Sequence, residues 1–310
     1  MSSASALQRG LDGLITPTES NAFPRRLGLA CQPRSVQLSV SIGFVGGGHM
    51  ASALIGGLLG KGFASGQLQV VEVSAEARER LRQRFGIDAR ASLDPGFTSC
   101  ECIVLATKPQ ELREVAASLA GLLHHQLLIS IAAGIRTDDV SRWLGGYRRI
   151  VRAMPNTPAV LGCGMSALYA APSANASERN LAESILSAVG ETLWLNDENA
   201  MDAVTAVSGS GPAYVYYFIE ALEEAARHQG LDAGAARQLT LQTVLGAARV
   251  ATECPEDAAA LRARVTSPGG TTERAIQLLE GAGLKEIVAR AVDAAAERSR
   301  ELGAEFGRQD

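Results

Sequence analysis

Ser41-Ile-Gly-Phe-Val-Gly-Gly-Gly-His-Met-Ala51 is the stretch of sequence that decides the fold of this chain. It joins a short β-rich run to a helical one, and Gly46, Gly48 and Ala51 match the pattern G-x-G-x-x-G/A. The first glycine permits a tight turn, the second lets the backbone approach a pyrophosphate, and the small third residue lets the helix close on the strand. The stretch therefore predicts a dinucleotide-binding turn. A tight strand-to-helix turn in an unrelated α/β fold is the alternative.

Strands and helices alternate outward from this turn as far as residue 198. We expect strands at 39–45, 68–73, 102–106, 127–131, 149–152, 166–169 and 191–195, and helices at 51–61, 76–85, 110–123, 137–144 and 180–189. Strands that alternate with helices of this length predict a parallel sheet covered on both faces. The fold class is therefore α/β, with a Rossmann-type, doubly wound parallel sheet over residues 41–198.

Strand signals cease after residue 198, and the rest of the chain is rich in Ala, Leu, Glu and Arg. Helices are expected at 199–207, 213–229, 233–253, 255–265, 272–280 and 284–302. The stretch 213–222 is almost entirely apolar, so its helix needs cover on all sides, and in a domain of this size another subunit is expected to supply it. Residues 199–310 are thus predicted to form an all-α substrate-binding and dimerisation domain.

Composition excludes several classes of function. The 310 residues carry a formal charge of -4 with no basic block, which argues against nucleic acids and membrane surfaces as partners. No apolar run reaches the length of a membrane span. Residues 1–40 show no sustained periodicity and are expected to be a disordered extension. An organelle transit peptide is the alternative, but Asp12 and Glu19 count against it.

The five cysteines are scattered, with no CxxC pair and no histidine at ligand spacing, so no disulfide framework and no metal site is predicted. This suggests a reducing, cytoplasmic location. Cys100 and Cys102 lead into the apolar run that ends at Ala106, where cysteines usually serve as small core residues, although a redox pair is the alternative.

The end of the second expected strand bears on the choice of cofactor. Glu72 lies where an acid hydrogen-bonds the ribose 2'-hydroxyl of NAD, whereas Ser74, Arg78 and Arg80 follow it and could hold the 2'-phosphate of NADP. Both NADH and NADPH therefore remain candidates. The stretches 106–109 and 130–134 end neighbouring strands, at the sheet edge where doubly wound folds bind ligands.

Candidate catalytic side chains are few. The chain has three lysines and four histidines, the histidines have no acidic partner at motif spacing, and the helical half offers only His228 and Lys285. A dehydrogenase that oxidises an alcohol needs a general base to take the hydroxyl proton. Reduction of a C=N bond needs less, because a cyclic iminium accepts hydride directly once it is held against the nicotinamide.

Six motifs occur together in order: Ile42-Gly-Phe-Val-Gly-Gly-Gly48, Ala106-Thr-Lys-Pro109, Ser130-Ile-Ala-Ala-Gly134, Arg152-Ala-Met-Pro-Asn-Thr-Pro158, Ser208-Gly-Ser-Gly-Pro-Ala-Tyr214 and Ser267-Pro-Gly-Gly-Thr-Thr272. From about Ser41 to Leu302 the chain resembles pyrroline-5-carboxylate reductase. The resemblance implies NAD(P)H-dependent reduction of 1-pyrroline-5-carboxylate to L-proline, the last step of proline biosynthesis. It also implies a helical domain that intertwines with its partner in a homodimer, and family members often assemble five dimers into a ring.

The resemblance also implies the site residues. Cofactor contacts fall on Phe44, Val45, Gly46, Gly47, Gly48, His49, Met50, Ala106, Thr107, Lys108, Pro109, Ala132, Ala133 and Asn156, to which the end of the second strand adds Glu72 and Ser74. Substrate contacts fall on Glu198, Val265, Ser267, Gly269, Gly270, Thr271 and Thr272. His49 stands where many members have Asn or Gln, and Glu72 differs from the small polar residues of members that prefer NADPH.

The loop that ends at Thr272 is the predicted substrate site. Gly270, Thr271 and Thr272 lead into a helix, and we expect their N–H groups to hold the substrate carboxylate. The Thr272 hydroxyl would meet the ring nitrogen as the catalytic group. Alternatively, Thr271 or Thr272 merely caps the helix. The alternative functions are a reductase of another cyclic imine, a β-hydroxyacid-type dehydrogenase, and a binding protein that senses the cofactor without turnover.

Overall fold

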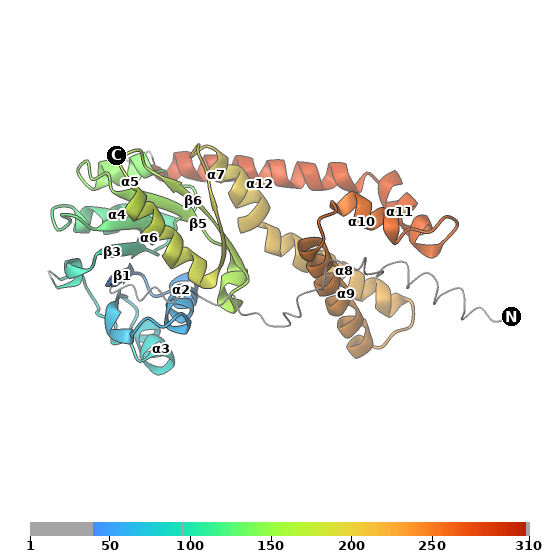
Figure 1. Cartoon of the computed structure of the whole chain (residues 1–310), viewed down its shortest axis with the longest axis horizontal. Coiled ribbons are helices and arrows are strands. Elements are labelled where there is room, and N and C mark those ends of the chain that lie inside the picture. The colour runs from blue at the N-terminus through green and yellow to red at the C-terminus, as the bar shows by residue number, and fades with distance from the viewer. Residues whose placement is uncertain (1–39, 95, 308–310) are drawn as a thin grey trace, which may run out of the picture. The chain divides into compact units, whose positions relative to one another are not determined.

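The computed structural model describes residues 40–94 and 96–307, and Figure 1 shows their arrangement. The extension expected over residues 1–40 lies outside the described residues, except for Val40. In the described part of the chain, seven strands form one sheet in the order β2-β1-β3-β4-β5-β6-β7. They are β1 (Ile42–Val45), β2 (Leu68–Val71), β3 (Cys102–Leu105), β4 (Leu127–Ser130), β5 (Ile150–Met154), β6 (Gly164–Ala170) and β7 (Gly190–Trp194).

The strand order confirms a doubly wound fold. β1 pairs in parallel with β2 on one side and with β3 on the other, and β3, β4 and β5 continue in parallel. The chain thus adds β2 on one side of β1 and then crosses over to add β3 on the other side, so the strand order reverses between β1 and β3. The carboxyl ends of these two strands flank the crevice where such folds bind ligands.

One strand departs from the parallel arrangement that the alternating pattern predicts. β6 pairs antiparallel with β5, and β7 then pairs in parallel with β6. The connection of residues 155–163 contains only one short 3₁₀ turn, η3 (Thr157–Leu161). A parallel crossover needs about a dozen residues or more, so a connection this short can return only in the antiparallel sense.

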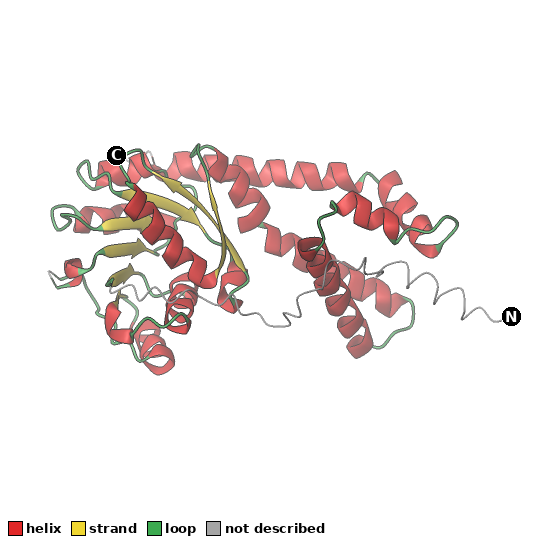
Figure 2. Cartoon of the chain, in the orientation of Figure 1, coloured by secondary structure: helices red, strands yellow, loops and turns green. Residues whose placement is uncertain are grey.

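Helices cover both faces of the sheet, as Figure 2 shows by the red coils around the yellow strands. They are α2 (His49–Gly60), α3 (Ala75–Phe85), α4 (Pro109–Leu119), α5 (Thr137–Trp143) and α6 (Ala176–Leu186), with short turns η1 (Ser65–Gln67), η2 (Phe97–Ser99) and η4 (Ser187–Val189). α6 begins four residues before the expected start because Asn175 and Glu178 form a capping box there.

The four residues of each of β1, β3 and β4 are all buried, as expected of parallel strands covered on both faces. One buried cluster includes Leu54 of α2 and Ile185 of α6. The other includes Leu112 of α4. Cys100 and Cys102 are 0% exposed, and burial raises the pKa of the Cys100 thiol to about 11. Both cysteines are therefore core residues, as predicted.

The second half is helical. Its elements are α7 (Ala200–Val204), the π-helical turn η5 (Thr205–Gly209), α8 (Gly211–His228), α9 (Ala233–Glu253), α10 (Ala258–Arg264), α11 (Thr271–Gly281) and α12 (Leu284–Gly307). The stretch 208–212, which its glycines mark as an interruption, instead carries the helix from α7 into α8 through a bond from Ser210 N–H to Thr205 O of 2.8 Å. Pro212 is tolerated because the first N–H groups of a helix have no intrahelical acceptor.

The C-terminal helix α12 packs against the first half. Phe306 packs against the buried cluster that includes Leu112, while Ser299 Oγ donates to Asp202 Oδ1 of α7, in the helical half, at 2.7 Å. A Cβ on Gly303 would lie 2.7 Å from the carbonyl oxygen of Gly134. α12 is thus fixed to the loop after β4, at the carboxyl edge of the sheet.

Helix α8 has no buried residue within one chain. Tyr216, Tyr217 and Phe218 are 61%, 73% and 51% exposed, and Leu239 and Leu245 of α9 are also exposed. Isolated apolar residues are normal on a protein surface, but a contiguous apolar face marks an interaction site. The described part of the chain, residues 40–94 and 96–307, therefore does not bury α8 in the way that its apolar sequence requires.

No helix among the described residues is long and apolar enough to cross a membrane.

Candidate functional site

The glycine-rich turn lies at the end of β1, as the fingerprint requires. Gly46 has a φ of +97°, a conformation that only glycine adopts readily, and a Cβ there would lie 2.6 Å from Ala106 O. Gly46 N–H donates to Val71 O, and Ala106 N–H donates to Val45 O, both at 2.8 Å. The turn is thereby held between the ends of β2 and β3.

This turn leaves a set of backbone donors without acceptors. Ser52 N–H is the first of α2 to find one, Gly48 O at 2.9 Å, so among the described residues the N–H groups of Gly48 through Ala51 are unpaired. A Cβ on Gly48 would meet no atom within 4 Å. Unpaired N–H groups at a helix start, with open space before them, fit a pyrophosphate.

Predicted cofactor residues on the neighbouring strands divide into two groups. Phe44 and Val45 are buried in the core, so their side chains do not reach the crevice. The stretch 106–109 leads into α4, and there Thr107 Oγ1 is buried with no hydrogen-bond partner among the described residues. A buried hydroxyl without a partner is costly, so it fits a site where a ligand completes the hydrogen bond.

Ser130 is a residue at this edge that the sequence reasoning did not assign. It ends β4, is 1% exposed, and its Oγ also has no hydrogen-bond partner in the part of the chain that the structure describes. Its motif, Ser130 to Gly134, includes the predicted cofactor residues Ala132 and Ala133, of which Ala132 is buried. A hydroxyl residue at the carboxyl end of an otherwise apolar strand was the signal available in the sequence.

One of the two predicted residues at the end of β2, Glu72, contacts the glycine turn itself. Glu72 Oε2 accepts from Gly47 N–H at 2.7 Å, and Glu72 Oε1 accepts from Ser74 N–H at 2.8 Å. Ser74 Oγ accepts from Ala77 N–H and caps α3. Glu72 thus lies beside the glycine turn, Ser74 is joined to Glu72, and their contacts with the cofactor stay a prediction.

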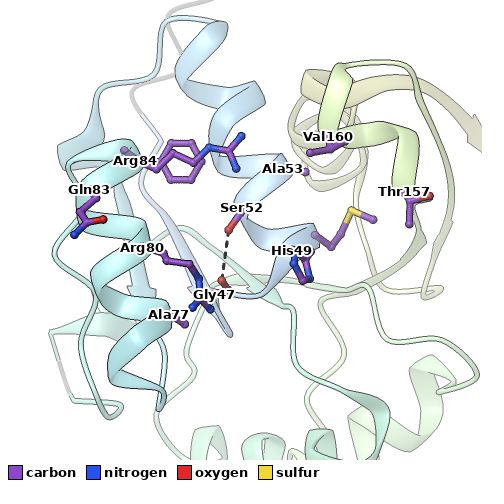
Figure 3. Close-up of a pocket in the computed structure, with 12 residues that line it drawn as sticks. Gly47, His49, Ser52, Ala53, Ala77, Arg80, Gln83, Arg84, Thr157 and Val160 are labelled. Atoms are coloured by element: carbon purple, nitrogen blue, oxygen red, sulfur yellow. Dashed lines mark hydrogen bonds between the residues drawn. The ribbon is translucent and has the colours of Figure 1, made fainter. Parts of the chain in front are cut away.

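A cavity of about 670 Å³ adjoins the same turn (Figure 3). Its lining comes from α2, α3 and η3, and comprises Gly47, His49, Met50, Ser52, Ala53, Ala77, Arg80, Gln83, Arg84, Phe85, Thr157 and Val160. The cavity therefore lies beside the pyrophosphate end of the cofactor site. It lacks the residues at the ends of β3 and β4 that would face a nicotinamide.

Two predicted site residues bind other parts of the protein. Glu198 Oε1 accepts from Thr137 N–H at 2.8 Å and from Arg152 at 3.2 Å, and Glu198 Oε2 accepts from the Thr137 hydroxyl at 2.9 Å. Asn156 donates through Nδ2 to Ser208 O and accepts through Oδ1 from Met165 N–H. Neither residue bonds to the loop at 265–272.

Arg152, the partner of Glu198, belongs to a quoted motif but was assigned no role. It is 3% exposed in β5, and burial lowers its pKa while the Glu198 carboxylate opposes this shift. A single arginine in the apolar run Ile150-Val-Arg-Ala-Met154 was the sequence signal for a buried ion pair. This pair ties β5 to the start of α5 and to the segment that leads into α7.

The predicted substrate loop follows α10, and its structure separates the two interpretations of its threonines. Ser267 O accepts from Gly270 N–H at 3.0 Å, with Pro268 second in the turn and Gly269 third at a φ of +71°. This is the pattern of a type II β-turn. Gly270 is the N-cap of α11, with no side-chain cap bond. Thr271 and Thr272 lie inside the helix, so neither hydroxyl caps it.

The unpaired N–H groups of this loop are not all those that the sequence predicts. Gly270 N–H is used by the β-turn, and Gly269 N–H donates to Glu273 Oε2 at 2.7 Å. Among the described residues, the N–H groups of Thr271, Thr272 and Glu273 have no acceptor. Gly270 N–H is therefore occupied within the turn, and the free donors begin one residue later, while the assignment of Gly270 to the substrate site stays a prediction.

No group of three or more His, Cys, Asp or Glu side chains within the described ranges could hold a metal ion.

Comparisons with known proteins agree with this arrangement. The family model for pyrroline-5-carboxylate reductase dimerisation matches residues 198–302, and the model described as NADP oxidoreductase coenzyme F420-dependent matches residues 41–134. A pyrroline-5-carboxylate reductase of Pseudomonas aeruginosa is 45% identical over 267 residues, which cover 86% of this chain and 98% of that protein.

Solved structures of pyrroline-5-carboxylate reductases are also similar to this chain. A pyrroline-5-carboxylate reductase of Coxiella burnetii superimposes with a TM-score of 0.79 at 40% identity and covers 85% of this chain and 98% of its own. The pyrroline carboxylate reductase of Plasmodium falciparum with NADP bound has a TM-score of 0.77 at 30% identity, with coverages of 86% and 98%. The chain belongs to the pyrroline-5-carboxylate reductase family.

Proposed function

We propose that the chain reduces 1-pyrroline-5-carboxylate to L-proline with NADPH or NADH, the last step of proline biosynthesis. The observation that carries the proposal is the start of α11, where the N–H groups of Thr271, Thr272 and Glu273 are unpaired. A helix start with free donors suits a carboxylate, the one anionic group of this substrate.

We further propose the division of the chain that the sequence suggests. Residues 41–198 bind the dinucleotide, and residues 199–310 bind the substrate and form the dimer. In support, one matched family model covers residues 41–134, inside the first range, and the other covers residues 198–302, which begins one residue before the second range. When bound, NAD(P)H supplies the hydride for the C=N carbon. The protein's own residues bind and orient the substrate.

The residues of the loop take separate tasks in this proposal. Thr271 and Thr272 N–H groups bind the carboxylate, while Ser267, Gly269 and Gly270 form the turn that aims them. The Thr272 hydroxyl donates a hydrogen bond to the ring nitrogen, which fixes the imine and places a proton source at that atom. Val265, 60% exposed in one chain, supplies an apolar contact to the ring.

In this proposal Glu198 positions the neighbouring sheet edge and does not contact the substrate. The Glu198 carboxylate already accepts hydrogen bonds from Thr137 and Arg152. If it lay next to the substrate, it would repel the substrate carboxylate. Thr137 lies shortly after the loop that contains Ala132 and Ala133. Glu198 therefore holds the edge on which the nicotinamide is expected to lie.

The substrate loop and the cofactor edge do not meet through hydrogen bonds within the described part of one chain. The loop's bonds are all local, and α12 extends from Gly303, at the sheet edge, back to Leu284. Nineteen helical residues span about 28 Å. Figure 1 shows α10 and α11 beside the N-terminal end of α12. We propose that the loop of one protomer completes the site on its partner's sheet edge.

A homodimer joined through the exposed faces of α8 and α9 is the smallest assembly that meets this requirement, and a decamer of five dimers is the larger candidate. Light scattering distinguishes them as two or ten times the chain mass of 32.4 kDa. A cytoplasmic location suits this function, because Cys100, Cys102, Cys163 and Cys254 are free thiols.

Replacing Thr272 tests the catalytic assignment. Thr272→Ala should lower kcat by about tenfold or more with little change in melting temperature, because the hydroxyl makes no cap bond. Thr252→Ala is the matched control, since its hydroxyl bonds only to a backbone carbonyl in α9. Unchanged kinetics for Thr272→Ala with a lowered melting temperature would leave the residue a structural role only.

A further inference from the structure

Glu72 places a carboxylate where the adenosine ribose of the cofactor is expected. It follows β2, and its oxygens accept from Gly47 N–H at 2.7 Å and Ser74 N–H at 2.8 Å, so the side chain is fixed beside the glycine turn. An ionised carboxylate offers about four acceptor sites, so acceptor sites remain for a ribose hydroxyl. Among the described residues, no Lys or Arg forms an ion pair with Glu72.

The groups that could hold a 2'-phosphate are mostly engaged elsewhere. Arg78 donates through Nη1 to Glu72 O at 2.8 Å and to Val73 O at 2.9 Å. Ser74 Oγ accepts from Ala77 N–H as the cap of α3. Val73 is 84% exposed, so the side chain next to Glu72 offers an apolar surface and no charge.

Arg80 is a second candidate cation beside Arg78, whose bonds to carbonyl oxygens do not neutralise its charge. Within the described ranges Arg80 has neither a hydrogen-bond partner nor an ion-pair partner, and it lines the cavity between α2 and α3 together with Gly47 (Figure 3). A phosphate monoester carries about 1.5 to 2 negative charges. The two guanidinium groups of Arg78 and Arg80 therefore cannot neutralise both the phosphate and the neighbouring Glu72 carboxylate, whereas the ribose of NADH brings no added charge.

We propose that Glu72 makes this chain select NADH over NADPH, an inference that rests on the proposed function. The carboxylate accepts hydrogen bonds from the 2'-hydroxyl of NADH and repels the 2'-phosphate of NADPH. Because two backbone N–H groups fix Glu72, it cannot swing away from the phosphate without leaving these donors unpaired.

The test measures equilibrium dissociation constants of NADH and NADPH by fluorescence titration, without substrate. The full-length chain should bind NADH about tenfold or more tightly than NADPH, and Glu72→Gln should reduce this ratio by about tenfold. Glu76→Gln is the matched control, because it removes the same charge from the exposed first turn of α3 and should leave the ratio unchanged. Arg80→Gln should leave NADH as the preferred cofactor.

A second measurement needs no variant and so does not depend on how Glu72→Gln folds. Salt screens charge interactions, with a Debye length that falls from about 30 Å at 0.01 M to about 3 Å at 1 M. If Glu72 repels the 2'-phosphate, added salt should narrow the preference for NADH. If Arg80 attracts it instead, added salt should weaken NADPH binding relative to NADH.

Tighter binding of NADPH by the unmodified chain, or a salt effect of the second kind, would overturn the proposal. So would a folded Glu72→Gln variant that keeps the original ratio. Because these titrations contain no substrate, the inference is tested apart from the proposed function. If the chain binds NADH preferentially but does not reduce pyrroline-5-carboxylate, only the proposed function is contradicted.

Discussion

Replacing Glu198 with alanine is expected to destabilise the fold more than it weakens substrate binding. The carboxylate is 11% exposed and is paired with Arg152, whose side chain is 4% exposed. It also accepts from the N–H and hydroxyl of Thr137, which is itself buried. The variant therefore leaves a buried cation and two buried donors without their acceptor.

The magnitude follows from these contacts. Breaking a buried ion pair by removing one partner costs about 3–5 kcal/mol. The loss at Thr137 does not add in full, because the two sets of bonds share one carboxylate. With an unfolding entropy of about 2.1 cal/mol/K for each of about 270 residues, this loss lowers the melting temperature by about 5–9 °C.

Thermal unfolding measures this change, with Glu191→Ala as the control, an exposed acid expected to shift stability by no more than about 0.5 kcal/mol. At a temperature where the variant stays folded, its KM for the substrate should change by less than about threefold. An unchanged melting temperature together with a KM raised about tenfold would contradict the reasoning, because Glu198 would then be a substrate contact.

Three further predictions follow from single contacts. Gly46→Ala should abolish cofactor binding in an equilibrium titration because its Cβ would lie 2.6 Å from a carbonyl oxygen, whereas Gly62→Ala, at a similar φ of +94° with no atom within 4 Å, should bind normally. Tyr217→Lys, in the exposed face of α8, should shift light scattering toward the monomer mass, and an unchanged mass would place the interface elsewhere. Alkylation at pH 8 should modify exposed Cys163 in the native protein and spare Cys100, whose pKa of about 11 keeps it a protonated thiol until the pH approaches that value. Equal labelling of the two would argue against the burial of Cys100.

The sequence predicts most of the fold because its patterns are local. The apolar runs predict the strands β1, β3 and β4, and the Ala-rich stretches predict the helices α9 and α12. The reversed direction of β6 was missed, although the short connection at 155–163 could have indicated it. The π-helical turn at 205–209 was not predictable from its residues, because Ser208 and its glycines also suit a loop.

The candidate site could be predicted only where one backbone segment forms it. The glycine turn and the start of α11 are local, and both present unpaired N–H groups as the sequence suggests. The Glu198–Arg152–Thr137 contact joins residues up to 61 positions apart in the chain, and no local pattern records which side chains meet. The hydrogen bond from Gly47 N–H to Glu72 could not be predicted for the same reason, because it joins residues from two different segments.

Turnover of 1-pyrroline-5-carboxylate by the purified chain tests the central claim most directly. The reaction is followed as the loss of NADH or NADPH absorbance, with the product identified by chromatography and larger cyclic imines as competing substrates. The account predicts stoichiometric L-proline and a strong preference for the five-membered ring that carries a carboxylate. Absence of L-proline, while a larger cyclic imine is reduced, would contradict it.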